Sequence, residues 1–250
     1  MYVEFSTADG RPLKADLSRP IDLSTPIVPG YNCVNAFHIS PPVFEPIRVG
    51  TFVGSVNEGG ACNCENLHLN AHGNGTHTEC VGHIAKERIT INSILRTFHF
   101  SAELITVTPS AADNGDLVIL REQIERAIQH RTQAILIRTL PNNATKLHAH
   151  YSGTNPTYLH HEAAQWIREQ GYQHLLIDQP SVDREEDGGL LLAHHAYWNY
   201  PHQTDGGLRT ITELMYASAD VKDGLYLLNL QIASLETDAS PSKPVLYPLV

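Results

Sequence analysis

Apolar residues in the middle of the chain alternate between short unbroken runs and helix-spaced patterns. Residues 102–108, 134–137 and 175–177 are rich in apolar and β-branched residues over the length of a strand, which is typical of strands buried on both faces. Between these runs, apolar residues recur at helical spacing over residues 121–130 and 159–170, which predicts two amphipathic helices. Two strand–helix–strand passages in one chain favour a mixed α/β layer fold.

The two ends of the chain carry a different pattern. Prolines and glycines divide the first third into short pieces, which favours strands and loops over helices, and residues 67–71 predict a strand that leads into a turn at residues 73–75. Near the other end, the apolar run from Gly224 predicts a long strand. The sequence Ser-Pro-Ser-Lys-Pro at residues 240–244 predicts a turn before a last short strand. We therefore expect one α/β domain over residues 1–250, with a mixed sheet core and flanking helices.

Composition argues against two classes of partner. The chain has 42% apolar and 18% charged residues, which is ordinary for a globular protein. Its net charge of −10 comes without a run of basic residues, so we expect no nucleic-acid partner. No apolar stretch approaches the roughly 20 residues that span a bilayer, so we expect no membrane partner. The first residues lack the features of a secretory signal, and we expect a cytoplasmic protein.

Candidate metal ligands are concentrated in residues 68–83, where histidines and one carboxylate are interleaved with glycines. His77 and Glu79 are two residues apart, so their side chains share one face of an extended segment. His72 lies across the turn at residues 73–75, whose glycines let the backbone approach a bound group, and it can converge with the other two. Cys80 would point to the opposite face, so we do not expect it to be a ligand. Two imidazoles and a carboxylate suit zinc, manganese or iron and leave positions open for water.

A second set of polar residues lies downstream. It consists of the segment Asp178-Gln-Pro-Ser-Val-Asp183, the pair His194-His195, and Glu213. Each of these alone also fits a solvated loop or a single buried, hydrogen-bonded imidazole. The same alternative applies to any one histidine of the first segment, as a loop residue on a polar surface. The density of that segment favours metal binding or catalysis.

Together, three segments resemble a known protein family. They are Asp22-Leu-Ser-Thr-Pro-Ile27, Gly75-Thr-His77-Thr-Glu79-Cys-Val-Gly-His83 and Asp178-Gln-Pro-Ser-Val-Asp183. They are similar to segments of the cyclase family, which includes bacterial kynurenine formamidases and isatin hydrolases. The family pattern is His-x-Gly-Thr-His-x-Asp-x-Pro-x-His, followed far downstream by a histidine and a glutamate. The resemblance extends over most of the chain.

The resemblance implies a swivelling β/β/α fold, as in kynurenine formamidase, that holds one or two zinc or manganese ions. His77 and Glu79 match metal ligands of the family, and His83 matches its catalytic histidine. The first family ligand falls on Gly73, so we assign that role to His72, one residue earlier. The family is usually oligomeric, which implies a homodimer or a homotetramer.

The downstream ligands are also carried over from the resemblance. His194 matches the histidine of a second metal position and Glu213 matches its glutamate, with Glu79 as the bridge and His195 as the reserve. The chain departs from the family pattern in having Glu79 for aspartate, Val81 for proline, and a longer gap between the two downstream ligands. A different substrate or a single-metal site would fit all three departures.

The resemblance implies hydrolysis of a C–N bond in a small amide, arylformamide or lactam. The metal would activate water and polarise the carbonyl, and His83 would act as general acid and base. A non-catalytic metal-binding or small-molecule-binding protein and a lyase or cyclase remain alternatives. The chain lacks the Gly-x-Ser-x-Gly elbow of serine hydrolases. Five aromatic residues could line a pocket for a small-molecule substrate or could belong to the core or an interface: Tyr31, Phe37, Tyr197, Trp198 and Tyr200.

Overall fold

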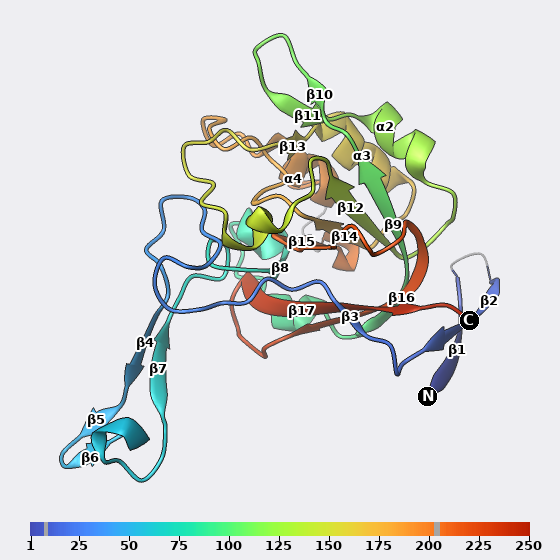
Figure 1. Cartoon of the computed structure of the whole chain (residues 1–250). Helices are drawn as coiled ribbons and strands as arrows, with labels where there is room; N and C mark the ends of the chain where they lie inside the picture. The colour runs from blue at the N-terminus through green and yellow to red at the C-terminus, as the bar shows by residue number, and fades with distance from the viewer. Residues whose placement is uncertain (8–9, 203–205) are drawn as a thin grey trace.

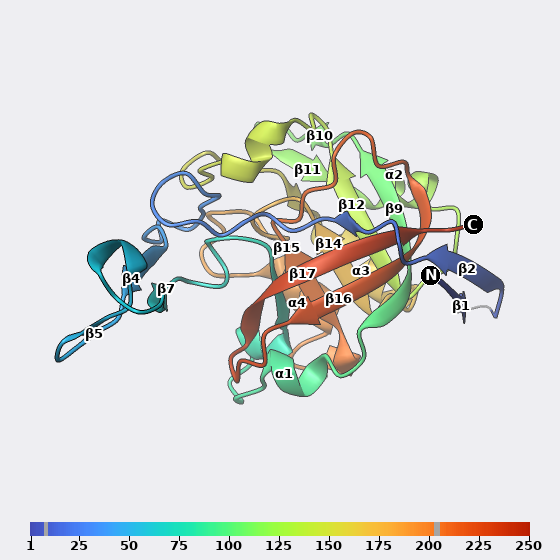
Figure 2. The same ribbon diagram turned by 60° about the horizontal axis from the view of Figure 1, so that its bottom comes forward.

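The computed structural model describes residues 1–7, 10–202 and 206–250. Within them, seven strands of a mixed sheet close into a barrel in the order β16-β9-β12-β14-β15-β8-β17, with β17 paired back onto β16 (Figures 1 and 2). The barrel strands are β8 (His77–Cys80), β9 (His99–Val107), β12 (Ala134–Thr139), β14 (His174–Ile177), β15 (Thr210–Glu213), β16 (Gly224–Ile232) and β17 (Ala239–Pro248). Neighbouring strands are parallel from β9 through β12 and β14 to β15. The other pairs of the barrel are antiparallel.

Shorter elements surround the barrel. The outer strands are β1 (Tyr2–Ser6), β2 (Pro12–Asp16), β3 (Ile21–Asp22), β4 (Val43–Pro46), β5 (Arg48–Val49), β6 (Phe52–Val53), β7 (Glu65–His68), β10 (Ser110–Ala111), β11 (Leu117–Ile119) and β13 (Tyr158–Leu159). The helices are α1 (Ile91–Ile94), α2 (Arg121–Ala127), α3 (His161–Glu169) and α4 (Leu192–Trp198), with 3₁₀ turns η1 (Val56–Glu58), η2 (Val81–His83), η3 (Ala144–His148) and η4 (Gly206–Leu208). None of the helices that the structure describes combines the length and apolar character needed to span a bilayer.

Alternate side chains of the central strands enter two separate apolar clusters. Leu104 of β9 packs with Leu228 of β16 in the cluster that fills the barrel. Its neighbour Ile105 packs with Ile124 of α2 and Ala163 of α3, in the cluster between the barrel and the helices. Both faces of these strands are therefore buried, which explains their unbroken apolar runs. The strands expected at residues 102–108, 134–137 and 175–177 are confirmed as β9, β12 and β14.

The first predicted helix is shorter than its sequence pattern indicates. Helix α2 ends at Ala127, and Ile128 has an extended backbone. The Glu103 carboxylate accepts hydrogen bonds from the backbone N–H groups of Gln129 and His130, at 3.0 Å each. A long-range side-chain partner thus takes the donors that would otherwise continue the helix.

The turn predicted at residues 240–244 is wrong, because these residues lie inside β17. Along this stretch the neighbour on one side of β17 changes from β8 to β3, so an unbroken row of N–H donors is not required there. Backbone hydrogen bonds hold β17 on both sides of this change of neighbour. Ser242 donates its N–H to the Thr76 carbonyl, and the Pro244 carbonyl accepts from Leu23, each at 3.0 Å.

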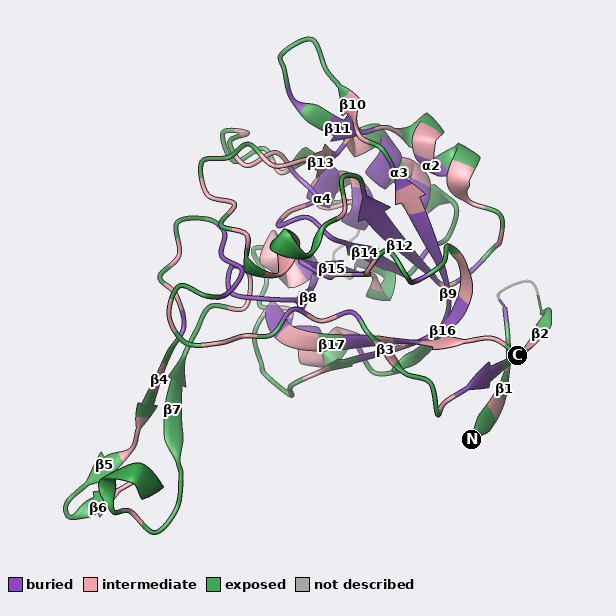
Figure 3. Cartoon of the chain, in the orientation of Figure 1, coloured by how far each residue is buried: buried purple, intermediate pink, exposed green. Residues whose placement is uncertain are grey.

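Strands β4 and β7 form an arm that extends away from the barrel, with β5, β6 and η1 at its tip (Figures 1 and 3). Strand β7 is exposed along its whole length. It begins at Glu65 and ends at His68, so the strand predicted over residues 67–71 lies earlier in the chain than expected. The cause is an Asn70 side chain that accepts hydrogen bonds from the N–H groups of His72 and Gly73, which forms a turn in place of further strand.

His174 is a buried imidazole at the start of β14. Its ring lies 3.9 Å from the Phe100 ring, and its Nδ1 is 2.8 Å from the Thr210 hydroxyl. Burial lowers the pKa of His174 to about 3. Between that pH and the ordinary histidine pKa of about 6.5, the unfolded chain binds one more proton here than the folded chain. The contribution of neutral His174 is therefore complete above about pH 6.5 and is lost as the pH falls.

We expect the pH dependence of unfolding to become shallower in the His174→Asn variant. In the wild type, His174 should lower the free energy of unfolding by about 1.4 kcal/mol per pH unit below about pH 6.5. The variant lacks this slope, although it is less stable than the wild type at neutral pH. Urea unfolding of both metal-free proteins between pH 7 and pH 4.5 measures the difference. Parallel stability curves would contradict the assignment.

Candidate metal centre

The register between β8 and β15 places three of the predicted site residues on one face. His77 lies opposite Glu213, and Glu79 lies opposite Ile211. The Nε2 of His77 is 3.3 Å from a carboxylate oxygen of Glu213, and all three site side chains are almost fully buried. Because side chains alternate along a strand, Thr78 points the other way and its hydroxyl is 2.7 Å from the Thr212 hydroxyl.

His72 reaches the same group from the turn that precedes β8. Its Nδ1 lies 3.2 Å from Oε2 of Glu79, and its ring is 5.1 Å from the His77 ring. The glycines of the turn allow close packing against neighbouring loops. A Cβ on Gly73 would lie 2.6 Å from the Ile39 side chain, so the glycine lets the chain pass close to the preceding loop.

His194 enters the centre from the first turn of α4. The Asp183 carboxylate accepts hydrogen bonds from the N–H groups of Ala193 and His194, at 2.6 and 3.1 Å. The same carboxylate is 2.5 Å from Nδ1 of His194, so it fixes both the helix start and the imidazole. This orientation brings Nε2 of His194 within 2.9 Å of Oε1 of Glu79. His195 is directed elsewhere, with its Nδ1 3.0 Å from the Tyr200 carbonyl.

His83 lies at the rim of the group, in η2, with 28% of its side chain exposed. Gly82 before it is required by packing, because an added Cβ would collide with the Ile89 carbonyl. The Nδ1 of His83 is 3.2 Å from Oδ2 of Asp238 and 3.9 Å from Oε2 of Glu79. With His83, the structure brings all six predicted site residues into one cluster.

Asp238 and Asp183 are the members of the cluster whose roles the sequence did not indicate. Asp238 precedes β17 directly, and its carbonyl accepts a hydrogen bond of 3.0 Å from the N–H of Cys80. The pairing of β17 with β8 thus places it beside His72 and His83, although it follows them by 166 and 155 residues. Asp183 ends a segment that resembles the family but has no assigned role there, whereas none of the segments of the resemblance includes Asp238.

The charges of the cluster compensate one another. Burial alone would raise the pKa of Glu79, but the positive imidazoles of His83 and His194 hold it well below its ordinary value. Burial alone would lower the pKa of His194, but the Glu79 charge and the hydrogen bond to Asp183 raise it well above the ordinary value. For His72, the hydrogen bond to Asp238 and nearby Glu79 outweigh burial and raise the pKa to about 10. Buried carboxylates here are stabilised by positive charge, which a proton or a metal ion can supply.

Two buried side-chain atoms of the kind that bind metals indicate where an ion fits. Among the described residues, Nε2 of His77 and Oε2 of Glu79 are buried without a hydrogen-bond partner, an arrangement that is costly unless something else binds them. Ligand atoms of His72, His77 and Glu79 all lie within 4.8 Å of one another. Two imidazole nitrogens and a carboxylate oxygen are a common donor set for zinc. The residues therefore fit a divalent transition metal.

A cavity of about 330 Å³ opens onto this centre and is lined in part by Phe37 and Leu191. Both have positive φ angles, 60° and 45°, which non-glycine residues rarely adopt outside functional or tightly constrained sites. Of the other aromatic residues considered for a pocket, Tyr197 and Trp198 belong to the buried core and Tyr31 is 76% exposed. Phe37 is the one that borders the cavity.

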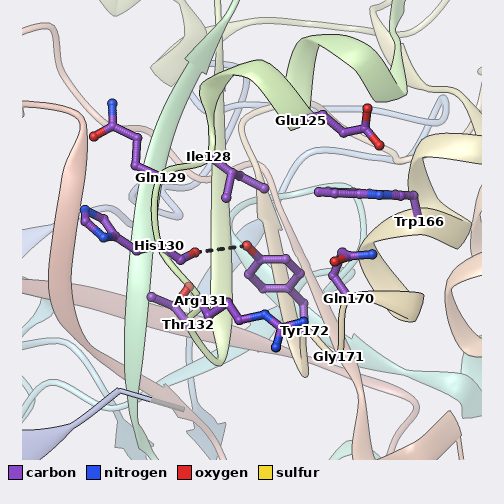
Figure 4. A pocket seen from close by; sticks show the side chains of 10 residues that line it. All are labelled: Glu125, Ile128, Gln129, His130, Arg131, Thr132, Trp166, Gln170, Gly171 and Tyr172. Carbon is purple, nitrogen blue, oxygen red and sulfur yellow. Dashed lines mark hydrogen bonds between the residues drawn. The ribbon is translucent and has the colours of Figure 1, made fainter. Parts of the chain in front are cut away.

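A second cavity of about 360 Å³ lies where α2 and α3 end (Figure 4). Trp166, Ile128 and Tyr172 line it, and the Tyr172 hydroxyl donates to the His130 carbonyl at 3.5 Å. None of the predicted site residues lines this cavity, so it is separate from the metal centre.

Comparison with known proteins gives a family and a fold. The family model Cyclase, described as "Putative cyclase", matches residues 15–184. No curated protein matches the chain. Solved structures match over nearly the whole chain at low sequence identity.

Three of these structures cover 92% of the chain each. The first is titled a potential metal-dependent hydrolase with cyclase activity, with 16% identity, a TM-score of 0.65 and 97% of that chain covered. The second is a predicted metal-dependent hydrolase from Bacillus stearothermophilus, with 17% identity, a TM-score of 0.62 and 98% covered. The third is isatin hydrolase A from Labrenzia aggregata bound to benzyl benzoate, with 16% identity, a TM-score of 0.62 and 93% covered. The expected mixed α/β fold is confirmed.

Proposed function

The chain belongs to the cyclase family, and on that premise we propose that it is a metal-dependent hydrolase of a C–N bond in a small amide, arylformamide or lactam. The observation that carries the proposal is the pair of buried ligand atoms on His77 and Glu79 that lack a hydrogen bond, next to residues that line a cavity. Structures of the same fold are named metal-dependent hydrolases and an isatin hydrolase. Isatin is a cyclic amide, which makes amides the first substrates to test.

His72, His77 and Glu79 would hold the ion. His194 and Glu213 would complete the same position, or would form a second position with Glu79 between the two. A bound divalent ion supplies Lewis-acid chemistry, by polarising a carbonyl and making water more acidic. The donor set suits zinc or manganese.

His83 would carry the proton during hydrolysis. It lines the cavity, and its ring is 5.3 Å from the His194 ring. In the reaction, the oxygen of water bonds to the carbonyl carbon and the C–N bond breaks. His83 accepts the proton that water loses and returns it to the departing nitrogen. Its partial exposure leaves room for substrate beside the imidazole.

The apolar wall of the cavity would bind the organic part of the substrate. Phe37 and Leu191 face the cavity that His72 and His83 also line. An aromatic or alkyl group placed against these side chains would leave its carbonyl toward the centre. Burial of apolar surface at about 25 cal/mol per Å² would contribute to binding, and exclusion of water would strengthen the polar contacts.

Removal of the metal should lower the melting temperature by roughly 5–15 °C. An ion that binds only the folded state, at 100 to 1,000 times its Kd, adds about 3–4 kcal/mol, and each kcal/mol is worth about 2–4 °C in a chain of this size. Differential scanning fluorimetry with and without chelator measures the shift, and added zinc or manganese should reverse it. Protein purified without chelator that contained no stoichiometric zinc, manganese, iron or cobalt would contradict the proposal.

Hydrolysis is tested with metal-loaded protein on a panel of N-formylanilines and lactams. Chelator-sensitive formation of a product heavier by one water, or of formate and an amine, is the expected result. A protein that binds the metal but converts none of these compounds would contradict the proposed substrate class and favour the non-catalytic binding alternative. Products formed by elimination or cyclisation, identified by mass spectrometry, would indicate a lyase or cyclase.

A further inference from the structure

One oxygen of Asp238 contacts two histidines of the centre. Its Oδ2 lies 2.9 Å from Nε2 of His72 and 3.2 Å from Nδ1 of His83. The two imidazole rings are 4.4 Å apart and tilted by 33°. Because a carboxylate oxygen only accepts, both nitrogens that face it must carry hydrogen. The contact therefore constrains which nitrogen of each neutral ring is free.

The unprotonated nitrogens are then the two that the proposed chemistry needs. Neutral His72 that donates from Nε2 has its lone pair on Nδ1, which lies 3.2 Å from Oε2 of Glu79. Two acceptors at this distance repel each other unless a cation lies between them, as in a metal site. Neutral His83 that donates from Nδ1 has its lone pair on Nε2, where it can accept a proton. A carboxylate that fixes the tautomer of a metal-binding histidine is a common partner of metal sites.

The backbone holds Asp238 firmly in this position. Its carbonyl accepts the N–H of Cys80, the residue after Glu79, at 3.0 Å. Strand β17 begins at the next residue, and its first residue, Ala239, pairs with Glu79. Asp238 is thus fixed to the strand that carries the buried carboxylate, although 37% of its own side chain is exposed.

We propose that Asp238 is a positioning residue that sets the tautomers of His72 and His83 together, so that one ring binds the metal through Nδ1 and the other accepts a proton at Nε2. The inference rests on the proposed function for the roles of the two histidines. It gives one carboxylate two effects, on metal affinity and on turnover. A residue with a purely structural role would not set the tautomers of the two rings.

The test compares Asp238→Ala with Asp238→Asn and with the control Glu236→Gln. Glu236 lies two residues earlier and bonds Thr90 and Asn92 without contacting the histidines. In Asp238→Ala, zinc affinity measured by competition with a chelating dye should fall by about 10–100-fold. The kcat on a substrate found for the wild type should fall at least tenfold with a smaller change in KM. Asp238→Asn keeps one weaker acceptor, so its zinc affinity and kcat should lie between those of Asp238→Ala and the wild type. The control should match the wild type.

A direct readout is the tautomer of each ring. In zinc-saturated protein labelled with ¹⁵N-histidine, long-range ¹H–¹⁵N spectra should show hydrogen on Nε2 of His72 and on Nδ1 of His83. Asp238→Ala should mix the His83 tautomers while the melting temperature stays close to that of the control. Wild-type zinc affinity and unchanged tautomers in Asp238→Ala would overturn the inference alone. Zinc binding without hydrolysis in the wild type would overturn the proposed function alone, and no zinc binding would overturn both.

Discussion

Substitution of Glu79 with glutamine should empty the metal centre and reduce hydrolysis by about a thousand-fold or more. Glu79 is fully buried, and its two oxygens lie 3.2 Å from His72 and 2.9 Å from His194. The amide is close in size but neutral, so the histidines lose the negative charge that attracts a cation. A loss of several kcal/mol of transition-state stabilisation corresponds to this change in rate.

Elemental analysis and turnover of the purified variant measure the two effects. Glu65→Gln in the exposed strand β7 is the matched control, because it makes the same chemical change far from the cavity. If Glu79→Gln retains one metal per chain at wild-type affinity, the carboxylate is not a ligand. The centre would then have to be assigned to the downstream residues.

The His83→Ala variant should lose turnover but keep its metal. His83 contacts the centre through Asp238, and its Nδ1 is 3.9 Å from Glu79. Its role as proton carrier predicts a fall in kcat of at least about a hundredfold, since general acid–base catalysis is typically worth 10²–10⁴. Metal content and melting temperature should stay close to the wild type, because the residue is at the rim and partly exposed.

A parallel loss of metal would show instead that His83 is a ligand. That outcome is a real alternative, since ligand atoms of Glu79, His83 and His194 also lie within 4.8 Å of one another. His68→Ala, in the exposed arm, controls for the loss of an imidazole. Full activity of His83→Ala on a substrate of the wild type would exclude the residue from the mechanism.

The parts of the centre that sequence could predict are those that depend on local geometry. His77 and Glu79 share a face because side chains alternate along any strand, and His72 is joined to them by a short turn. The central strands were also predictable, because burial on both faces leaves a continuous apolar run. These features need no knowledge of distant parts of the chain.

The parts that could not be predicted depend on long-range pairing. Asp238 reaches the histidines only because β17 pairs with β8, and nothing around residue 238 indicates which strand it joins. The prolines of β17 indicated a turn, but three neighbouring strands hold them in extended conformation. The choice of His194 over His195 came from the family resemblance, and its physical cause is the Asp183 carboxylate that orients the ring.

The metal centre is completed late in biosynthesis, because β17 closes the barrel. Strand β8, which carries His77 and Glu79, is synthesised early, but its neighbours in the sheet are β15 and β17, from the last fifth of the chain. A nascent polypeptide that lacks β17 has an open sheet edge at β16 and no carboxylate at position 238. Exposed edges of this kind favour association between chains, and slow long-range pairing prolongs that exposure. We therefore expect metal acquisition to follow translation, once β17 has paired with β8.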